Sequence, residues 1–153
     1  MKTEASMPDR HEVSPSTARK LVFVGFMGAG KSRAARRVAP RLGLEAIDTD
    51  ALLVAELGQS IESFFDSHGE AAFRAREEAL VLDLLDRPGP AVVALGGGAV
   101  ESARVRERLA DHLSIYLVVE QELAWQRASG SQRPLAKDKE RFGELLASRA
   151  PLY

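Results

Sequence analysis

The sequence predicts an α/β fold of three layers, α/β/α, in which helices cover both faces of one parallel β-sheet. Two observations carry this prediction. Short, almost wholly apolar segments such as LVFVGF (residues 21–26) alternate with longer segments whose apolar residues recur at helical spacing. The short segments lack the alternation of a half-exposed strand, so we expect them to be buried on both faces, as strands of a parallel sheet are.

The first half of the chain contains two strand-helix units. Residues 21–26 are the first expected strand, and residues 31–42 the first helix, with small apolar residues on one face and a break at its proline. Residues 44–50 (LEAIDTD) predict a second strand that ends in two aspartates. Residues 51–57 predict a helix that the following glycine ends.

The second half repeats this order. A single long helix is expected from about Ser67 to Leu85, because apolar and charged residues interleave until a Pro-Gly-Pro segment stops it. Residues 91–95 predict a third strand that runs into three glycines, and a charged helix is expected at 102–109. A fourth strand is expected at 113–119, followed by helices at 121–127 and 139–147.

Composition limits the classes of function. We expect a polar tail at residues 1–19 and one domain at 20–153. A net charge of −1 gives no sign of a nucleic-acid or membrane partner, and no run of about 18 apolar residues is present. The absence of cysteine excludes disulfides and thiolate sites and favours a cytoplasmic location. We expect a monomer.

The segment Gly25–Ser32 (GFMGAGKS) matches the phosphate-binding pattern G-x-x-x-x-G-K-[ST] at every position. Backbone amides of such a loop converge on phosphate oxygens, the lysine contacts the β- and γ-phosphates, and the serine can bind Mg²⁺. The motif predicts a P-loop NTPase fold that binds ATP with Mg²⁺. The ATP-binding candidates are Gly28, Ala29, Gly30, Lys31, Ser32 and Arg33, the last at a place where many P-loops carry a small hydroxyl residue.

Asp48 and Asp50 lie two residues apart at the end of the second expected strand. If the extended geometry persists, both carboxylates point to the same side. One could hold Mg²⁺ near Ser32, and the other could deprotonate an acceptor hydroxyl. The alternative for Asp50 is that it caps the helix that starts at Ala51.

Arg74 precedes Glu77 and Glu78 at the spacings that let a carboxylate orient a guanidinium. An oriented arginine could bind a substrate carboxylate, whereas the alternative is a solvated surface ion pair. Phe65 and Phe73 are core residues by default, with contact to a ring-shaped substrate as the alternative.

The triplet Gly96, Gly97 and Gly98 places backbone without side chains at the end of the third strand, where a substrate could approach the amides. Arg133 lies in a glycine- and serine-containing loop, where a lid arginine could stabilise charge on a transferred phosphoryl group. The three histidines lack metal-ligand spacing.

Together these motifs resemble the shikimate kinase family, a group of small P-loop kinases. The resemblance covers residues 20–153 and rests on the order of GFMGAGKS, IDTD, FFDSHGEAAFRAREE, ALGGGAV, RPLA and RAPLY. It implies transfer of the γ-phosphoryl group of ATP to the 3-hydroxyl of shikimate, in aromatic amino-acid biosynthesis.

The resemblance also implies roles for single residues. Lys31 and Arg133 would hold the phosphates, and Ser32 with Asp48 would hold Mg²⁺. Asp50 would be the base. Arg74, Gly97 and Arg149 would bind shikimate, with Gly96 and Gly98 beside Gly97. Arg127 lies near the position of an adenine-side arginine.

Two departures from the family pattern leave alternatives open. RPLA replaces the more usual RPLL, and members of the family continue past PLY into a further strand and helix, so we expect the domain to be incomplete at its C-terminal end, with an open edge strand. The alternatives are a P-loop kinase for gluconate or a nucleoside monophosphate, and a weak or inactive nucleotide-binding fragment of a longer or fused protein.

Overall fold

The chain forms one four-stranded parallel sheet with the strand order β2-β3-β1-β4. The computed structural model describes residues 19–131 and 134–153, so nearly all of the predicted tail lies outside the described residues. The strands are β1 (Leu21–Val24), β2 (Ala46–Asp48), β3 (Val92–Ala94) and β4 (Leu113–Tyr116). In the register, Val22 pairs with Val93 of β3 and with Ser114 of β4.

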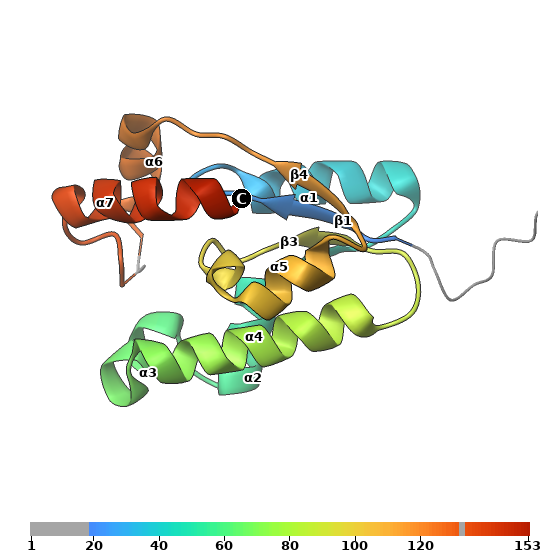
Figure 1. Cartoon of the computed structure of the whole chain (residues 1–153), viewed down its shortest axis with the longest axis horizontal. Coiled ribbons are helices and arrows are strands. Elements are labelled where there is room, and N and C mark those ends of the chain that lie inside the picture. The colour runs from blue at the N-terminus through green and yellow to red at the C-terminus, as the bar shows by residue number, and fades with distance from the viewer. Residues whose placement is uncertain (1–18, 132–133) are drawn as a thin grey trace, which may run out of the picture.

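Helices connect and surround these strands (Figure 1). The α-helices are α1 (Lys31–Val38), α2 (Thr49–Leu57), α3 (Ile61–His68), α4 (Glu70–Asp86), α5 (Ala103–Leu109), α6 (Gln121–Ala128) and α7 (Lys139–Arg149). Short 3-10 turns are η2 (Ala39–Leu42), η3 (Ala99–Glu101) and η4 (Ala150–Leu152). No helix in the described part of the chain combines the length and apolarity needed to cross a membrane.

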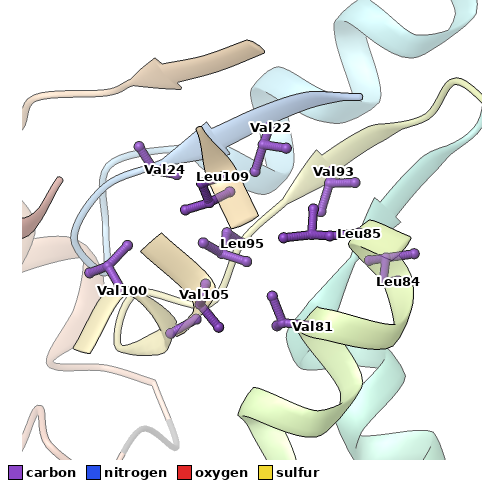
Figure 2. Close-up of a cluster of buried hydrophobic side chains, with 11 residues drawn as sticks. Val22, Val24, Val81, Leu84, Leu85, Val93, Leu95, Val100, Val105 and Leu109 are labelled. Atoms are coloured by element: carbon purple, nitrogen blue, oxygen red, sulfur yellow. The ribbon is translucent and has the colours of Figure 1, made fainter. Parts of the chain in front are cut away.

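Alternate side chains of the central strands point to opposite faces, which confirms the predicted layers. Val22 and Val24 pack with buried residues of α4 and α5 on one face, and Figure 2 shows this cluster. Phe23, between them, packs on the other face against Ala35 and Ala39 of α1 and η2. Because both faces of the central strands β1 and β3 are covered, these two strands are apolar throughout, as the sequence indicated.

The structure corrects the prediction of one long helix starting near Ser67. Gly69 has φ 82° and ψ 168°, a conformation that side chains disfavour, and it separates α3 from α4. The first of these two helices, at Ile61–His68, was not predicted. Ser60 caps it by accepting a hydrogen bond from the Ser63 amide at 3.1 Å.

The predicted strands are also longer than those observed. β2 ends at Asp48, because the chain enters α2 at Thr49, and β4 ends at Tyr116. β4 lies at one edge of the sheet, and all four of its residues are exposed, Leu113 to 56%, so the expected burial on both faces is wrong for this strand.

The parallel order places the carboxyl ends of all four strands at one edge of the sheet. β1 lies between β3 and β4. After β1, the chain forms β2 and β3 on one side of this strand and then crosses to form β4 on its other side. Such a reversal opens a crevice at the carboxyl end of the central strand. Figure 1 shows α6 and α7 beyond this end. Residues that follow β1, β2 and β3 line one cavity there.

At the opposite end of the sheet, His112 accepts a hydrogen bond at Nδ1 from the backbone N–H of Lys20, at 3.2 Å. A protonated ring would carry a hydrogen on Nδ1 and could not accept this bond. Burial lowers the pKa of His112, the charge of Lys20 lowers it further, and Asp111 acts in the opposite direction. The folded chain therefore favours the neutral imidazole.

This predicts a loss of stability in mild acid. The unfolded chain binds a proton at His112 near pH 6.5 (about the ordinary value), whereas the folded chain resists it, so the free energy of unfolding falls as pH drops below that value. His112→Asn keeps an acceptor but does not titrate. Urea unfolding at two pH values on either side of 6.5 should show a smaller loss for the variant; equal losses would contradict the assignment.

Candidate active site

The segment Gly25–Ser32 connects β1 to α1, as its motif predicts. Gly28 has φ 83°, and a Cβ there would lie 2.9 Å from the Ala124 carbonyl oxygen of α6, so a side chain at this position would be both strained and crowded. Lys31 begins α1, and its Nζ donates a hydrogen bond to the Phe26 carbonyl at 2.9 Å. The ammonium group is therefore held against the loop.

A cavity of about 700 Å³ opens at this loop and at the start of α1. Its charged lining residues are the cations Lys31, Arg33, Arg37 and Arg127 and the carboxylates Asp48 and Asp50. The excess of cations, together with the positive end of α1, suits a polyanionic ligand. All the predicted ATP-binding residues line this cavity except Arg133, which lies outside the described residues.

Arg127 reaches the loop from α6, where its Nη1 donates a hydrogen bond to the Gly28 carbonyl at 2.9 Å. The structure therefore joins two predicted residues that are far apart in the sequence. Arg37 was not predicted, although it lies one helical turn after Arg33, a spacing that places both on one face of α1.

Asp48 connects the P-loop to the start of α2. The Ser32 hydroxyl donates to its Oδ2, and its Oδ1 accepts the backbone N–H groups of Asp50 and Ala51 at 3.0 and 3.2 Å. Asp48 is therefore the cap of α2, and the alternative that Asp50 is the cap is wrong. The serine hydroxyl and the carboxylate are hard oxygen ligands of the kind that Mg²⁺ takes together with water.

Asp50 lies in the first turn of α2, so the extended geometry expected for this segment does not persist. The intervening Thr49 is fully buried, and its Oγ1 accepts the Gly96 N–H at 2.8 Å. This hydrogen bond ties the start of α2 to the glycine triplet after β3. Thr49 was missed because a threonine between two aspartates gives no sign of a partner 47 residues away.

A second, smaller cavity of about 70 Å³ adjoins the first. Its polar lining comes from Asp50, Arg74, Glu77, Gly97, Gly98 and Arg149. Apolar side chains complete it, from Met27, Ile61, Phe65, Phe73, Pro134 and Leu135. Phe73 is also buried in the core and Phe65 packs against the same cluster, as expected by default, while contact with a ring-shaped substrate stays a prediction. Asp50 lines both cavities.

Arg74 is oriented by Glu77, as the spacing predicted. Its Nη1 lies 2.5 Å from Oε2 of Glu77, whose side chain is only 2% exposed, so the alternative of a solvated surface pair is wrong. Burial raises the pKa of Glu77, and the charge of Arg74 opposes this rise. The pair directs a guanidinium into the second cavity.

Arg149, the last residue of α7, is a second buried cation at this cavity. Its side chain is 2% exposed, its Nε donates to Oε1 of Glu101 at 2.8 Å, and its guanidinium lies 5.8 Å from the Phe26 ring centre. Its Nη2 is buried and has no hydrogen-bond partner among the described residues. A buried donor without a partner is costly, and a ligand acceptor would satisfy it.

The glycine triplet makes room for these side chains. A Cβ at Gly96 would lie 2.7 Å from Oε1 of Glu77 and 2.8 Å from Oδ1 of Asp50, and one at Gly98 would lie 2.2 Å from Nη1 of Arg74. None of the three has a positive φ. Gly96 and Gly98 therefore make room for side chains, whereas a Cβ at Gly97 would lie 3.3 Å from the backbone nitrogen of Met27 in the P-loop. The sequence reasoning considered only access to the backbone.

Two further residues were missed by the sequence reasoning. Glu101 contacts both arginines of the second cavity. The Tyr153 hydroxyl donates to the Gly97 carbonyl at 2.6 Å and so joins the end of η4 to the triplet. Neither has a local sequence signal, because each acts through contacts with distant segments.

Comparisons with known proteins agree with this geometry. The family model for shikimate kinase matches residues 27–153. Shikimate kinases from Paramagnetospirillum magneticum and Mycobacterium leprae are 43% and 45% identical to the chain, over 92% and 89% of its length and 74% and 70% of theirs. The solved structure of shikimate kinase from Acinetobacter baumannii in complex with shikimate has a TM-score of 0.83 and 36% identity, and the match covers 90% of this chain and 79% of that one. The chain therefore belongs to the shikimate kinase family.

Proposed function

We propose that this chain transfers the γ-phosphoryl group of ATP to the 3-hydroxyl of shikimate. Membership of the family supports this activity. The single observation that carries it in the structure is the place of Asp50, which lines both the large cationic cavity and the small cavity with two arginines. A donor and an acceptor bound in these two cavities would meet at this carboxylate.

On the donor side, the P-loop amides and Lys31 would hold the phosphates of ATP. The loop ends at the N-terminus of α1, where unpaired N–H groups and the helix dipole favour negative charge. Arg33 and Arg127 would add positive charge at the rim of the cavity. Arg133 lies outside the described residues, so its contact with the transferred phosphoryl group stays a prediction.

Ser32 and Asp48 would hold Mg²⁺. Their oxygens belong to the ligand class that this ion prefers, and they already lie together at the phosphate loop. When bound, the ion would neutralise charge on the phosphate oxygens. Groups of three or more Asp, Glu, His or Cys residues suited to a metal are absent from the described part of the chain, so phosphate and water would supply the remaining ligands.

On the acceptor side, Arg74 and Arg149 would bind the carboxylate of shikimate. Arginine pairs with carboxylates through parallel hydrogen bonds, and the unpartnered Nη2 of Arg149 is available for one of them. Gly97 and Gly98 line the same cavity, whereas the Gly96 amide is bonded to Thr49. We therefore narrow the backbone part of the substrate site to Gly97 and Gly98.

Asp50 would act as the base. Its carboxylate would accept the proton of the 3-hydroxyl as that oxygen forms a bond to the γ-phosphorus, while the bond from this phosphorus to the bridging oxygen breaks and ADP leaves. The apolar rings of Phe65 and Phe73 would cover the acceptor and limit the entry of water.

We also propose that the chain acts as a monomer in the cytoplasm. Both cavities are lined by residues of a single chain, so a second copy is not needed to form the site. The cysteine-free composition is compatible with a reducing compartment. Sedimentation analysis with both substrates present would test the monomeric state.

The proposed function is tested by ADP release with a panel of acceptors. We expect turnover that requires both shikimate and Mg²⁺, with much weaker turnover on gluconate or a nucleoside monophosphate. A folded chain that binds ATP but shows no turnover with shikimate would refute the proposal and favour an inactive nucleotide-binding fragment.

Asp50→Asn should lower kcat by roughly 10²- to 10⁴-fold, because the amide cannot accept the proton. The P-loop is untouched, so the affinity for ATP should stay close to that of the wild type. Steady-state kinetics and calorimetry with ATP would check both parts. Unchanged turnover would show that Asp50 is not the base.

Arg74→Ala should weaken shikimate binding by about 1.5–3 kcal/mol, which corresponds to roughly 10- to 150-fold in KM. The matched control is Arg76→Ala, which removes an arginine of the same helix that is 61% exposed and pairs at 3.7 Å with Glu56. The control should leave KM for shikimate nearly unchanged. Similar effects of the two variants would argue against a specific carboxylate contact.

A further inference from the structure

Glu101 lies directly behind the acceptor cavity, at the end of η3 and after the glycine triplet. Its backbone is fixed on both sides. The Glu101 N–H donates to the Gly98 carbonyl at 3.0 Å, and the Glu101 carbonyl accepts Nη1 of Arg106 at 3.0 Å. The side chain therefore starts from a rigid position next to Gly98, which lines the acceptor cavity.

The carboxylate of Glu101 contacts both arginines of that cavity. Its Oε1 accepts Nε–H of Arg149 at 2.8 Å, and its Oε2 lies 3.5 Å from Nε of Arg74. The first contact is a hydrogen bond, and the second is an ion pair without hydrogen-bond geometry. Glu101 is thus a bridge between α4 and α7, which supply the two cations.

Glu101 makes these contacts without being part of the lining of the acceptor cavity. It lines a separate cavity of about 350 Å³ together with Glu78, Gly98 and Ser102. Arg74 lines both of these cavities and so lies between them. A residue in this place can orient the arginines without contacting the substrate.

The bonds of the two guanidinium groups show what is left for a ligand. Arg149 directs its Nε–H to Glu101, whereas Nε of Arg74 lies 3.5 Å from an oxygen of Glu70 and 3.5 Å from an oxygen of Glu101. Arg74 uses Nη1 for Glu77, and Arg149 retains a buried Nη2 without a partner among the described residues. Glu101 therefore holds Arg149 by a hydrogen bond and adds an ion pair to Arg74, which Glu77 also holds, and Nη2 of Arg149 is left for an incoming carboxylate.

We propose that Glu101 is a positioning residue that holds Arg74 and Arg149 in the orientation required to bind the acceptor carboxylate. Without its side-chain oxygens, the Nε–H of Arg149 would lose its hydrogen-bond acceptor, and Arg74 would lose one of the two side-chain oxygens near its Nε. The inference rests on the proposed function, because it assigns the residue to the binding of shikimate.

The test compares two substitutions of the same length. Glu101→Gln keeps an oxygen that accepts Nε–H of Arg149, whereas Glu101→Met has no such acceptor. We expect KM for shikimate to rise at least about 10-fold in the Met variant and to stay within about threefold of wild type in the Gln variant. KM for ATP should change little in either, because Glu101 does not line the P-loop cavity.

Glu78→Ala is the matched control. Glu78 lines the same rear cavity, but it pairs with Arg104 at 2.9 Å and accepts the Ser102 hydroxyl at 2.6 Å instead of contacting Arg74 or Arg149. Its removal deletes one negative charge nearby and should leave KM for shikimate unchanged. If Glu78→Ala raised KM for shikimate as much as Glu101→Met does, the loss of a nearby negative charge would explain both effects. That result would overturn the positioning role of Glu101.

The remaining outcomes separate this inference from the proposed function. Wild-type turnover on shikimate, with the same KM in the Gln and Met variants, would overturn the role of Glu101 alone. Equal increases in KM for shikimate and ATP in the Met variant would indicate a general loss of structure and would also overturn it. A wild-type chain that is folded but shows no turnover on shikimate would overturn both proposals.

Discussion

The acceptor site depends on holding two guanidinium groups, those of Arg74 and Arg149, at one cavity. Arg149 is 2% exposed, and a buried cation without partners would be strongly destabilising. Glu77 pairs with the first arginine, and Glu101 contacts both. These carboxylates offset the free-energy cost of burying the cations, and they leave Nη2 of Arg149 free to donate to a ligand. The cavity therefore selects for an acceptor that brings its own negative charge.

The parallel sheet explains how such distant residues come together. The P-loop follows β1, Asp48 ends β2 and the glycine triplet follows β3, so all three lie at one edge of the sheet. Hydrogen bonds then connect these segments, from Ser32 to Asp48 and from the Gly96 amide to Thr49. The donor loop and the acceptor cavity are thus parts of one hydrogen-bonded structure, which favours a fixed distance between the two substrates.

The sequence predicted the sheet and the phosphate loop well, because both have strong local signals. Continuous apolar segments predict buried parallel strands, and the spacing of glycine, lysine and serine in the loop follows from contact with phosphate. Arg74 and Glu77 were also paired correctly from their spacing. Arg149 could be named only through the family resemblance, since a lone arginine near the end of a helix has no signal of its own.

What the sequence could not predict depends on contacts between distant segments. Glu101 and Arg149 are 48 residues apart, and no pattern around either of them indicates the other. The division of the long helix at Gly69 depended on one backbone conformation that a helical pattern does not reveal. The cap of α2 was assigned to Asp50 as an alternative because the strand was expected to continue past Asp48, where the chain in fact turns into the helix.

The central claim is that two arginines, Arg149 buried and Arg74 partly buried, select the acceptor through its carboxylate. The most direct measurement is calorimetric titration of the ATP-bound chain with shikimate and with its methyl ester, which keeps the ring and hydroxyls but lacks the negative charge. The account predicts that the ester binds more weakly by at least about 1.5 kcal/mol, roughly tenfold in Kd, because buried guanidinium donors lose a charged partner. Equal affinities for the acid and the ester would contradict it.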